Sequence, residues 1–161
     1  MKRLLLCRHA KSGWSDNALA DIDRPLNRTG KRDAARLGEK LAANGICPDL
    51  ILSSPAKRAF ATAAKLARKV KYPQDNIVVN DKVYGATLQE LFNIIKGLDN
   101  SHNTVYLVGH NPETTLLVNY LGALTVNNIP TCGIVALEFN VRTWAESDRR
   151  NCSLIFFEYP G

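Results

Sequence analysis

Two arginines and two histidines have the clearest chemical potential in this sequence: Arg8, His9, Arg58 and His110. A guanidinium group is a planar, permanently charged donor that matches the oxygens of a phosphate. An imidazole beside it can act as a nucleophile or donate a hydrogen bond. Each residue alone has an ordinary interpretation, as a surface charge, a helix cap or a solvated side chain. Together they would form a pocket for a dianionic phosphoryl group.

Arg8, His9 and His110 come just after apolar runs that are typical of buried strands, and Arg58 lies one turn into the helix predicted after another such run. These runs end at Cys7, Leu52 and Val108. If the three strands are parallel neighbours, the side chains that follow them converge at one edge of the sheet, where ligands of such folds bind. Two predicted helix N-termini, at Pro55 and Pro112, would add N–H groups and partial positive charge there.

Strand and helix patterns alternate along the chain, which predicts one α/β domain over residues 1–161 with three α/β/α layers and a mostly parallel central sheet. We expect strands at residues 3–8, 49–52, 76–79, 104–108, 133–139 and 152–159, the last two half exposed. We expect helices at residues 29–44, 54–69, 87–98 and 112–122, with Ser54 capping the second and His110 or Asn111 the fourth.

Net charge, the length of apolar runs and the spacing of cysteines restrict the classes of function that this chain could have. The chain carries 21 Lys and Arg against 15 Asp and Glu, a net charge of +6 that favours anionic ligands. No apolar run approaches the roughly 18 residues of a membrane span, so we expect a cytoplasmic protein. None of the four cysteines has zinc-site spacing, so we expect free buried thiols.

Three motifs, in order, resemble the histidine phosphatase superfamily, which includes cofactor-dependent phosphoglycerate mutase and the acid phosphatases. They are Leu-Cys-Arg-His-Ala at 6–10, Ser-Pro-Ala-Lys-Arg with a following Thr at 54–62, and Val-Gly-His-Asn-Pro at 108–112. The Arg-His-Ala-Lys-Ser start and the Asp-Arg-Pro-Leu-Asn stretch at 23–27 are most similar to the SixA branch of phosphohistidine phosphatases.

The resemblance implies a phosphoglycerate mutase-like fold and a role for each central residue. His9 would be the nucleophile and become phosphohistidine, while Arg8 and Arg58 would hold the phosphoryl oxygens. His110 would donate a hydrogen bond to the same group. Because these cations and imidazoles stabilise the transferred charge, the resemblance implies no metal and no cofactor.

The residue that would act as general acid is not fixed by these motifs. Asp81, four residues before Gly85, is the candidate, although it could equally be a turn residue before Tyr84. Glu90 is a second candidate, but it also fits a capping box at the start of a helix. An alkoxide leaving group needs a proton from the enzyme. A site with a weak or absent acid therefore favours phosphohistidine over phosphate monoesters.

Further candidates line the same edge. Lys11, Ser12 and Thr131 could contact the phosphoryl group. Arg24 and Asn27 could position the first long loop, or Arg24 could pair locally with Asp21 or Asp23. Trp14 in that loop could face the substrate or anchor a lid.

The favoured function is removal of a phosphoryl group from phosphohistidine on a protein, such as a phosphotransfer domain or a phosphocarrier, by a monomeric enzyme. The alternatives are an acid phosphatase or mutase that acts on a small phosphate monoester, and a non-catalytic module that binds phosphate or a nucleotide. Nucleic-acid binding rests on charge alone, and neither nucleic acid nor a membrane is expected as a partner.

Overall fold

One six-stranded sheet forms the centre of the chain, with the strand order β3-β2-β4-β1-β5-β6. We describe a computed structural model, which covers residues 1–13 and 17–161. The strands are β1 (Lys2–Arg8), β2 (Leu50–Ser53), β3 (Val78–Val79), β4 (Thr104–Gly109), β5 (Ile134–Phe139) and β6 (Cys152–Glu158). The first four are mutually parallel, whereas β5 is antiparallel to β1, and β6 to β5. The predicted mostly parallel sheet is confirmed.

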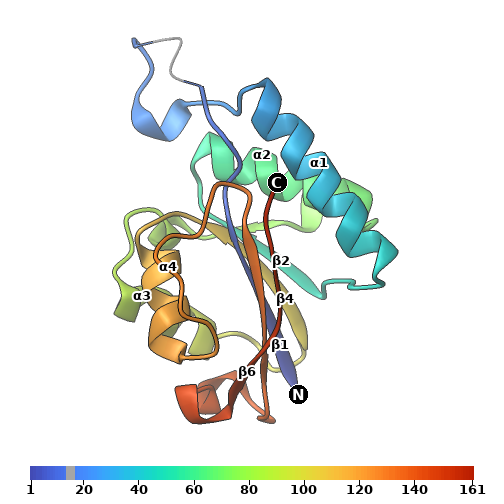
Figure 1. Cartoon of the computed structure of the whole chain (residues 1–161), viewed down its shortest axis with the longest axis vertical. Coiled ribbons are helices and arrows are strands. Elements are labelled where there is room, and N and C mark those ends of the chain that lie inside the picture. Colours follow the sequence, from blue (N-terminus) through green and yellow to red (C-terminus); the bar gives the residue numbers. More distant parts are fainter. Residues whose placement is uncertain (14–16) are drawn as a thin grey trace.

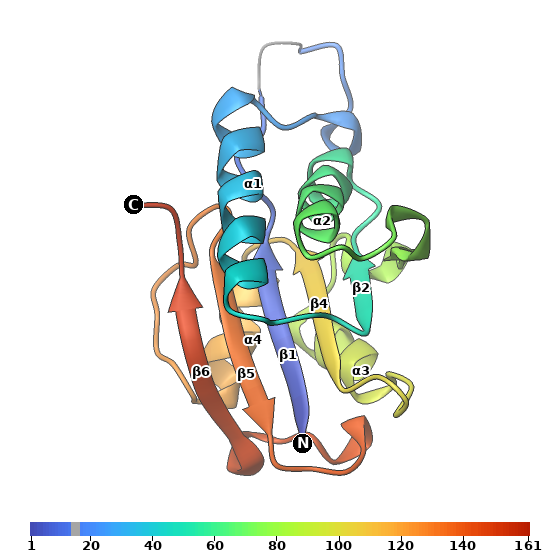
Figure 2. The ribbon, with the colours of Figure 1, turned by 90° about the vertical axis from the view of Figure 1, so that its right-hand side faces the viewer.

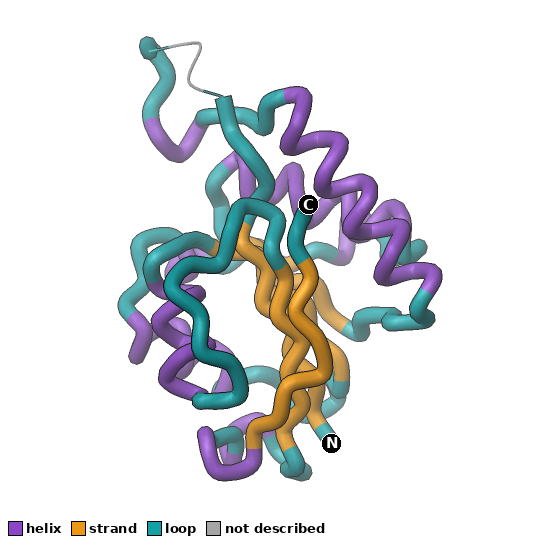
Figure 3. Tube along the Cα trace, viewed as in Figure 1, coloured by secondary structure: helices purple, strands orange, loops and turns teal. Residues whose placement is uncertain are grey.

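Helices cover both faces of this sheet, so the three predicted layers are also confirmed. Helices α1 (Arg28–Ala43) and α2 (Lys57–Lys69) lie on one face, and α3 (Leu88–Lys96) and α4 (Glu113–Leu121) lie on the other (Figures 1 and 2). Figure 3 shows the strands in orange between the two sets of purple helices. Short 3₁₀ helices interrupt the connections: η1 (Asp21–Asp23), η2 (Gln74–Asn76), η3 (Asp81–Val83), η4 (Trp144–Glu146) and η5 (Arg149–Asn151).

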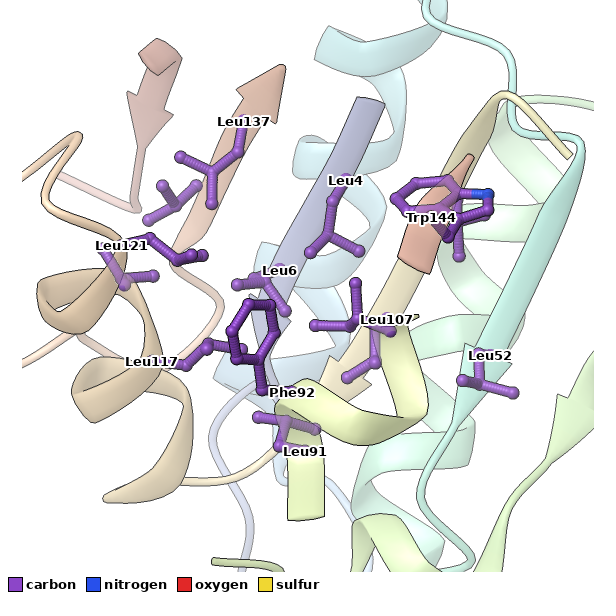
Figure 4. Close-up of a cluster of buried hydrophobic side chains, with 14 of the residues drawn as sticks. Leu4, Leu6, Leu52, Leu91, Phe92, Leu107, Leu117, Leu121, Leu137 and Trp144 are labelled. Carbon is purple, nitrogen blue, oxygen red and sulfur yellow. The ribbon is translucent and has the colours of Figure 1, made fainter. Parts of the chain in front are cut away.

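The continuous apolar run of β1 follows from its two covered faces. Leu4 and Leu6 join the core beneath α3 and α4. Leu5 and Cys7 point to the opposite face, because side chains alternate along a strand, and pack beneath α1 and α2. Figure 4 shows the first core, in which Leu4 and Leu6 lie beside side chains of α3 and α4.

The register of the strands brings three strand ends into line. Arg8 of β1 pairs with Gly109 of β4, and Ser53 of β2 pairs with Val108. The residues that follow these positions therefore emerge together at the carboxyl edge, as the sequence predicted.

Two strand predictions need correction. Strand β5 was expected to be half exposed, but it lies between β1 and β6 and is almost wholly buried. The mostly exposed strand is β6, at the edge of the sheet. Strand β3 keeps only two residues, because Gln74–Asn76 turn as a 3₁₀ helix instead.

The helix starts also differ in part. Helix α2 begins at Lys57, and Ser54 instead accepts a hydrogen bond from the Ala56 N–H. Helix α4 follows Pro112, and the predicted capping by Asn111 is confirmed, because its side-chain oxygen accepts a hydrogen bond from the Thr115 N–H over 3.3 Å. The capping box of Thr87 and Glu90 is confirmed at α3.

The cysteine prediction holds for two of the four thiols. Cys7 and Cys132 are free and buried, whereas Cys47 is exposed and Cys152 is partly exposed. None of the helices in the described parts of the chain is long and apolar enough to cross a membrane.

Candidate active site

The two histidines meet at the carboxyl edge of the sheet. The ring centroids of His9 and His110 lie 5.1 Å apart. The Nε of Arg58, from the first turn of α2, donates a hydrogen bond to Nε2 of His9 over 3.3 Å. Both imidazoles and this guanidinium group are less than a tenth exposed.

Two contacts define the protonation of the His9 ring. Its Nδ1 lies 2.7 Å from the carbonyl oxygen of Ala10. A carbonyl oxygen can only accept, so Nδ1 carries the proton. Arginine can only donate, so Nε2, which faces Arg58, carries a lone pair. The neutral ring therefore presents a nucleophilic nitrogen toward a cation.

Burial keeps both histidines neutral. It lowers the pKa of His9 to about 4, and the nearby Arg58, Arg8 and Arg24 act in the same direction. Burial also lowers the pKa of His110 to about 3, helped by His9 and Arg58. A neutral histidine is the form needed for nucleophilic attack, and this site maintains it at neutral pH.

Asp21, at the start of η1, holds Arg58 in place. The Nη1 of Arg58 donates to the backbone oxygen of Asp21 at 2.7 Å, and Nη2 lies 3.1 Å from its carboxylate. Arg24 pairs with the same carboxylate at 3.1 Å. A hydrogen bond from Tyr84, followed by the Arg58 contact, lowers the pKa of Asp21 to about 2. This carboxylate is thus ionised at neutral pH.

The loop before β5 holds the backbone and side chain of Arg8. Its Nη1 donates to the backbone oxygen of Ile129 over 2.8 Å. The Cys132 N–H lies 3.1 Å from the backbone oxygens of both Arg8 and His9. The Nε of Arg8 is buried and has no hydrogen-bond partner within residues 1–13 and 17–161. That donor is the kind of group an anionic ligand would satisfy.

Ser54 and Tyr84 complete the surroundings of His110. Ser54 Oγ shares a hydrogen bond of 2.7 Å with Nε2 of His110. The Tyr84 ring meets the His110 ring edge-on, with centroids 5.5 Å apart. Its hydroxyl donates to Asp21 over 2.5 Å, which raises the pKa of Tyr84. The hydroxyl is therefore a weaker acid than an ordinary phenol.

The two candidates for the general acid lie apart from these contacts. Asp81 is exposed at the start of η3, and its carboxylate makes no hydrogen bond or ion pair with the described residues. It is Tyr84, three residues later, that reaches the site from this turn. Glu90 is occupied in the capping box of α3.

The secondary candidates lie around the same loops. Lys11 is exposed, Ser12 forms an isolated bridge with Leu26, and Thr131 is half buried beside Cys132. Arg24 makes the local ion pair with Asp21, and Asn27 caps α1. Trp14 lies outside the described residues.

Sequence reasoning missed three groups of this site. Asp21 and Tyr84 contact it across long sequence separations, so no local pattern marks them. Ser54 was interpreted as a helix cap alone. A fourth residue, Thr62, was inside the recognised motif: it accepts from the Ala10 N–H and donates to the Arg58 oxygen, tying the two catalytic segments together.

A lone-pair nitrogen that faces the guanidinium group of Arg58 can accept a phosphoryl group, whose charge that cation would stabilise. The described residues contain no group of three or more His, Cys, Asp or Glu that could hold a metal ion. Fold and site together are those of a phosphoryl-transfer enzyme.

Comparison with known proteins agrees with this class. Residues 4–81 match the model of the histidine phosphatase superfamily, branch 1. A chloroplastic protein of Arabidopsis thaliana, itself uncharacterised, is 32% identical over 154 residues, which are 91% of this chain and 70% of that protein. A crystal structure from Agrobacterium tumefaciens, assigned as the phosphohistidine phosphatase SixA, is 30% identical, with a TM-score of 0.79 over 99% of this chain and 98% of that one.

A protein histidine phosphatase SixA in complex with tungstate shares the fold at 19% identity, with a TM-score of 0.81 over 98% of this chain and 96% of the other. This chain therefore belongs to the histidine phosphatase superfamily, branch 1, and within it to the SixA-type proteins. It is a phosphatase by family and by fold.

The lowered pKa values predict a pH dependence of stability. Unfolded histidines titrate near 6.5, whereas His9 and His110 titrate at about 4 and about 3 in the fold. As pH falls from about 6.5 to 4, the unfolded state binds more protons than the folded state at both histidines, so the free energy of unfolding falls, by roughly 5 kcal/mol in total.

Urea unfolding across this pH range, in buffer without phosphate, measures the effect. The double variant His9→Asn, His110→Gln is the control, because neither amide titrates. Its stability should change much less between pH 6.5 and 4. An equal loss in the variant and the parent would show that other groups cause the dependence.

Proposed function

We propose that this protein hydrolyses phosphohistidine on another protein in the cytoplasm, through a covalent phosphoryl intermediate on His9 and without a metal. The observation that carries the proposal is the arrangement around Arg58. The lone pair of His9 Nε2 faces this arginine, and the carboxylate of Asp21, which contacts it, is already ionised. The similarity to SixA-type proteins supports the same substrate class.

The ionised carboxylate bears on the leaving group. Because the pKa of Asp21 is about 2, it holds no proton at neutral pH that it could give to an alkoxide. The raised pKa of Tyr84 makes its hydroxyl a poor donor as well. A phosphohistidine ring protonated on its second nitrogen leaves as neutral imidazole, and so needs no acid from the enzyme. The site is therefore best suited to cleaving a P–N bond.

In the first step, Nε2 of His9 attacks phosphorus and the P–N bond of the substrate breaks. The electron pair of that bond stays with the departing imidazole, which leaves neutral. The phosphorylated ring of His9 is now cationic, and its Nδ1–H remains bonded to the Ala10 oxygen. Arg8 and Arg58 stabilise the charge on the transferred oxygens.

In the second step, water attacks phosphorus and the bond to Nε2 breaks. The electron pair returns to Nε2, which restores neutral His9, and the protons of the water stay with the released phosphate. A bound dianion would raise the pKa of His110, allowing it to take up a proton from solvent and donate a hydrogen bond to the phosphoryl group.

Two assays with a chelator present test this function. One follows phosphate release from a phosphohistidine-labelled phosphotransfer domain, and the other uses a panel of small phosphate monoesters. We expect turnover of the labelled protein at least about a hundredfold above that of any monoester, expressed as kcat/KM. The Asp81→Asn variant should keep the activity on the labelled protein.

The opposite pattern would overturn the proposal. Fast hydrolysis of one monoester, lost in Asp81→Asn, would identify a small-molecule phosphatase that uses Asp81 as its acid. The absence of a phosphoryl-enzyme with every substrate would point to a non-catalytic phosphate-binding module.

A further inference from the structure

A groove lined by cationic side chains lies along α1, outside the contacts among His9, His110 and Arg58. This groove, of about 430 Å³, runs between α1 and the segment that follows β6. Figure 2 shows the end of the chain beside α1. Four cationic side chains line the groove: Lys11, Arg32, Arg36 and Lys40.

The cations outweigh the carboxylates in this groove. Asp33 lies 3.6 Å from Arg32, and Glu158 lies 3.4 Å from Lys40. Lys11 and Arg36 have no ion-pair partner among the described residues. Arg32, Arg36 and Lys40 are spaced four residues apart on α1, so they share one face of the helix. The groove thus presents a basic stripe with two uncompensated charges.

One end of this groove lies at the catalytic loop. Lys11 is two residues from His9, so their Cα atoms are at most about 7 Å apart. Helix α1 is held against the same loop: the Asn27 N–H donates to the Lys11 oxygen at 3.0 Å. Gly30 fits so tightly that a Cβ there would come within 2.1 Å of that oxygen. The groove and the nucleophile are therefore fixed relative to each other.

The lining of the groove favours a protein ligand. Leu37, Tyr159 and Pro160 add apolar surface to the cations. Acidic protein segments combine carboxylates with apolar side chains, which this mixture complements. A nucleic-acid backbone has no apolar side chains to place against Leu37 and Pro160, and the lining offers bases one aromatic ring, Tyr159, instead of a row of rings for stacking.

We infer that this groove, the α1 groove, binds an acidic segment of the phosphoprotein substrate and so presents its phosphohistidine to His9. The inference rests on the proposed function and names the surface by which the substrate is recognised. Electrostatic docking of this kind raises the association rate and weakens with salt.

The test compares two substrates of different size. The first is a phosphohistidine-labelled phosphotransfer domain with net negative charge, and the second is free phosphoramidate, which is too small to reach the groove from the catalytic site. The variant Arg36→Glu, Lys40→Glu should lower kcat/KM for the labelled domain about tenfold or more, mainly through KM. It should leave hydrolysis of phosphoramidate unchanged.

Two controls make the result specific. Arg142→Glu with Arg150→Glu changes the net charge equally, but these exposed residues lie in the connection that follows β5, at the opposite end of the sheet. That variant should behave as the parent with both substrates. Arg36→Gln with Lys40→Gln removes the charge without reversal and should give a smaller loss, with a melting temperature close to that of the parent.

Several outcomes would overturn the inference. Equal kcat/KM of the α1 variant and the parent on the labelled domain would exclude docking in the α1 groove. So would an equal loss on both substrates, or competition by duplex DNA at concentrations where an acidic protein does not compete. If the parent hydrolyses only monoesters, the proposed function itself fails, which is a separate result.

Discussion

Replacing His9 with asparagine is expected to abolish phosphoryl-enzyme formation and to lower kcat/KM by at least about 10⁴-fold. The asparagine amide can still donate to the Ala10 oxygen, as Nδ1 of His9 does. It has no lone-pair nitrogen to face Arg58, so it cannot form the P–N bond. The fold should be retained, and only the chemistry should be lost.

The measurement is transfer of labelled phosphate from the phosphorylated substrate to the enzyme, quenched in base because phosphohistidine is stable there. His102→Asn is a matched control, since the backbone oxygen of His102 accepts hydrogen bonds from Lys2 and Trp144, away from the site. It should form the intermediate as the parent does. Label that still enters the His9→Asn protein would contradict the nucleophile assignment.

Replacing Arg58 with alanine is expected to lower kcat/KM by about 10³-fold, mostly through kcat. The guanidinium group bridges His9 and Asp21 by three separate nitrogens, so it aligns the nucleophile with a cation. The Arg58→Lys variant should recover only a small part of the loss, because an ammonium group cannot make these contacts at once.

Asp21→Asn separates the two roles of this arginine. It keeps the cation at the site but removes the carboxylate that competes with a phosphoryl group for the same nitrogens. We expect kcat/KM within about tenfold of the parent. We also expect tighter inhibition by inorganic phosphate, measured as a lower inhibition constant. A loss as large as that of Arg58→Ala would instead make Asp21 essential for holding the guanidinium group.

These predictions share one physical basis. The buried imidazoles are neutral in the unliganded site, while the arginines are charged. A phosphoryl dianion that binds here meets arginines that are already in place, so little rearrangement of the site is needed. Its negative charge then favours protonation of His110. Cys7, two residues before His9, is a poor candidate for this chemistry because burial raises the pKa of its thiol.

Much of the site followed from local patterns in the sequence. Buried strands appear as apolar runs, and their ends are marked by the first polar residues, which here are Arg8, His9 and His110. Parallel strands place such ends at one edge, so a one-dimensional pattern was enough to predict the convergence of the site. The same local logic identified the capping box of Thr87 and Glu90 at α3.

The predictions that failed depended on what covers each element. Strand β5 is almost wholly buried, although its partly alternating pattern predicts a half-exposed strand. Its own residues do not show that β1 and β6 flank it on both sides. The start of α2 was placed at Ser54, because a serine before proline is a good cap; the structure uses that hydroxyl to hold His110 instead.

The sequence by itself determined the layered α/β fold, the two histidines and two arginines, and the family to which they belong, because these depend on local periodicity and short motifs. Only the tertiary structure decided that Asp21 and Tyr84 join the site, that Asp81 stands apart from it, and that α1 and Lys11 line a basic groove. Those features arise from contacts between segments far apart in the chain, and their geometry exists only once the sheet has assembled.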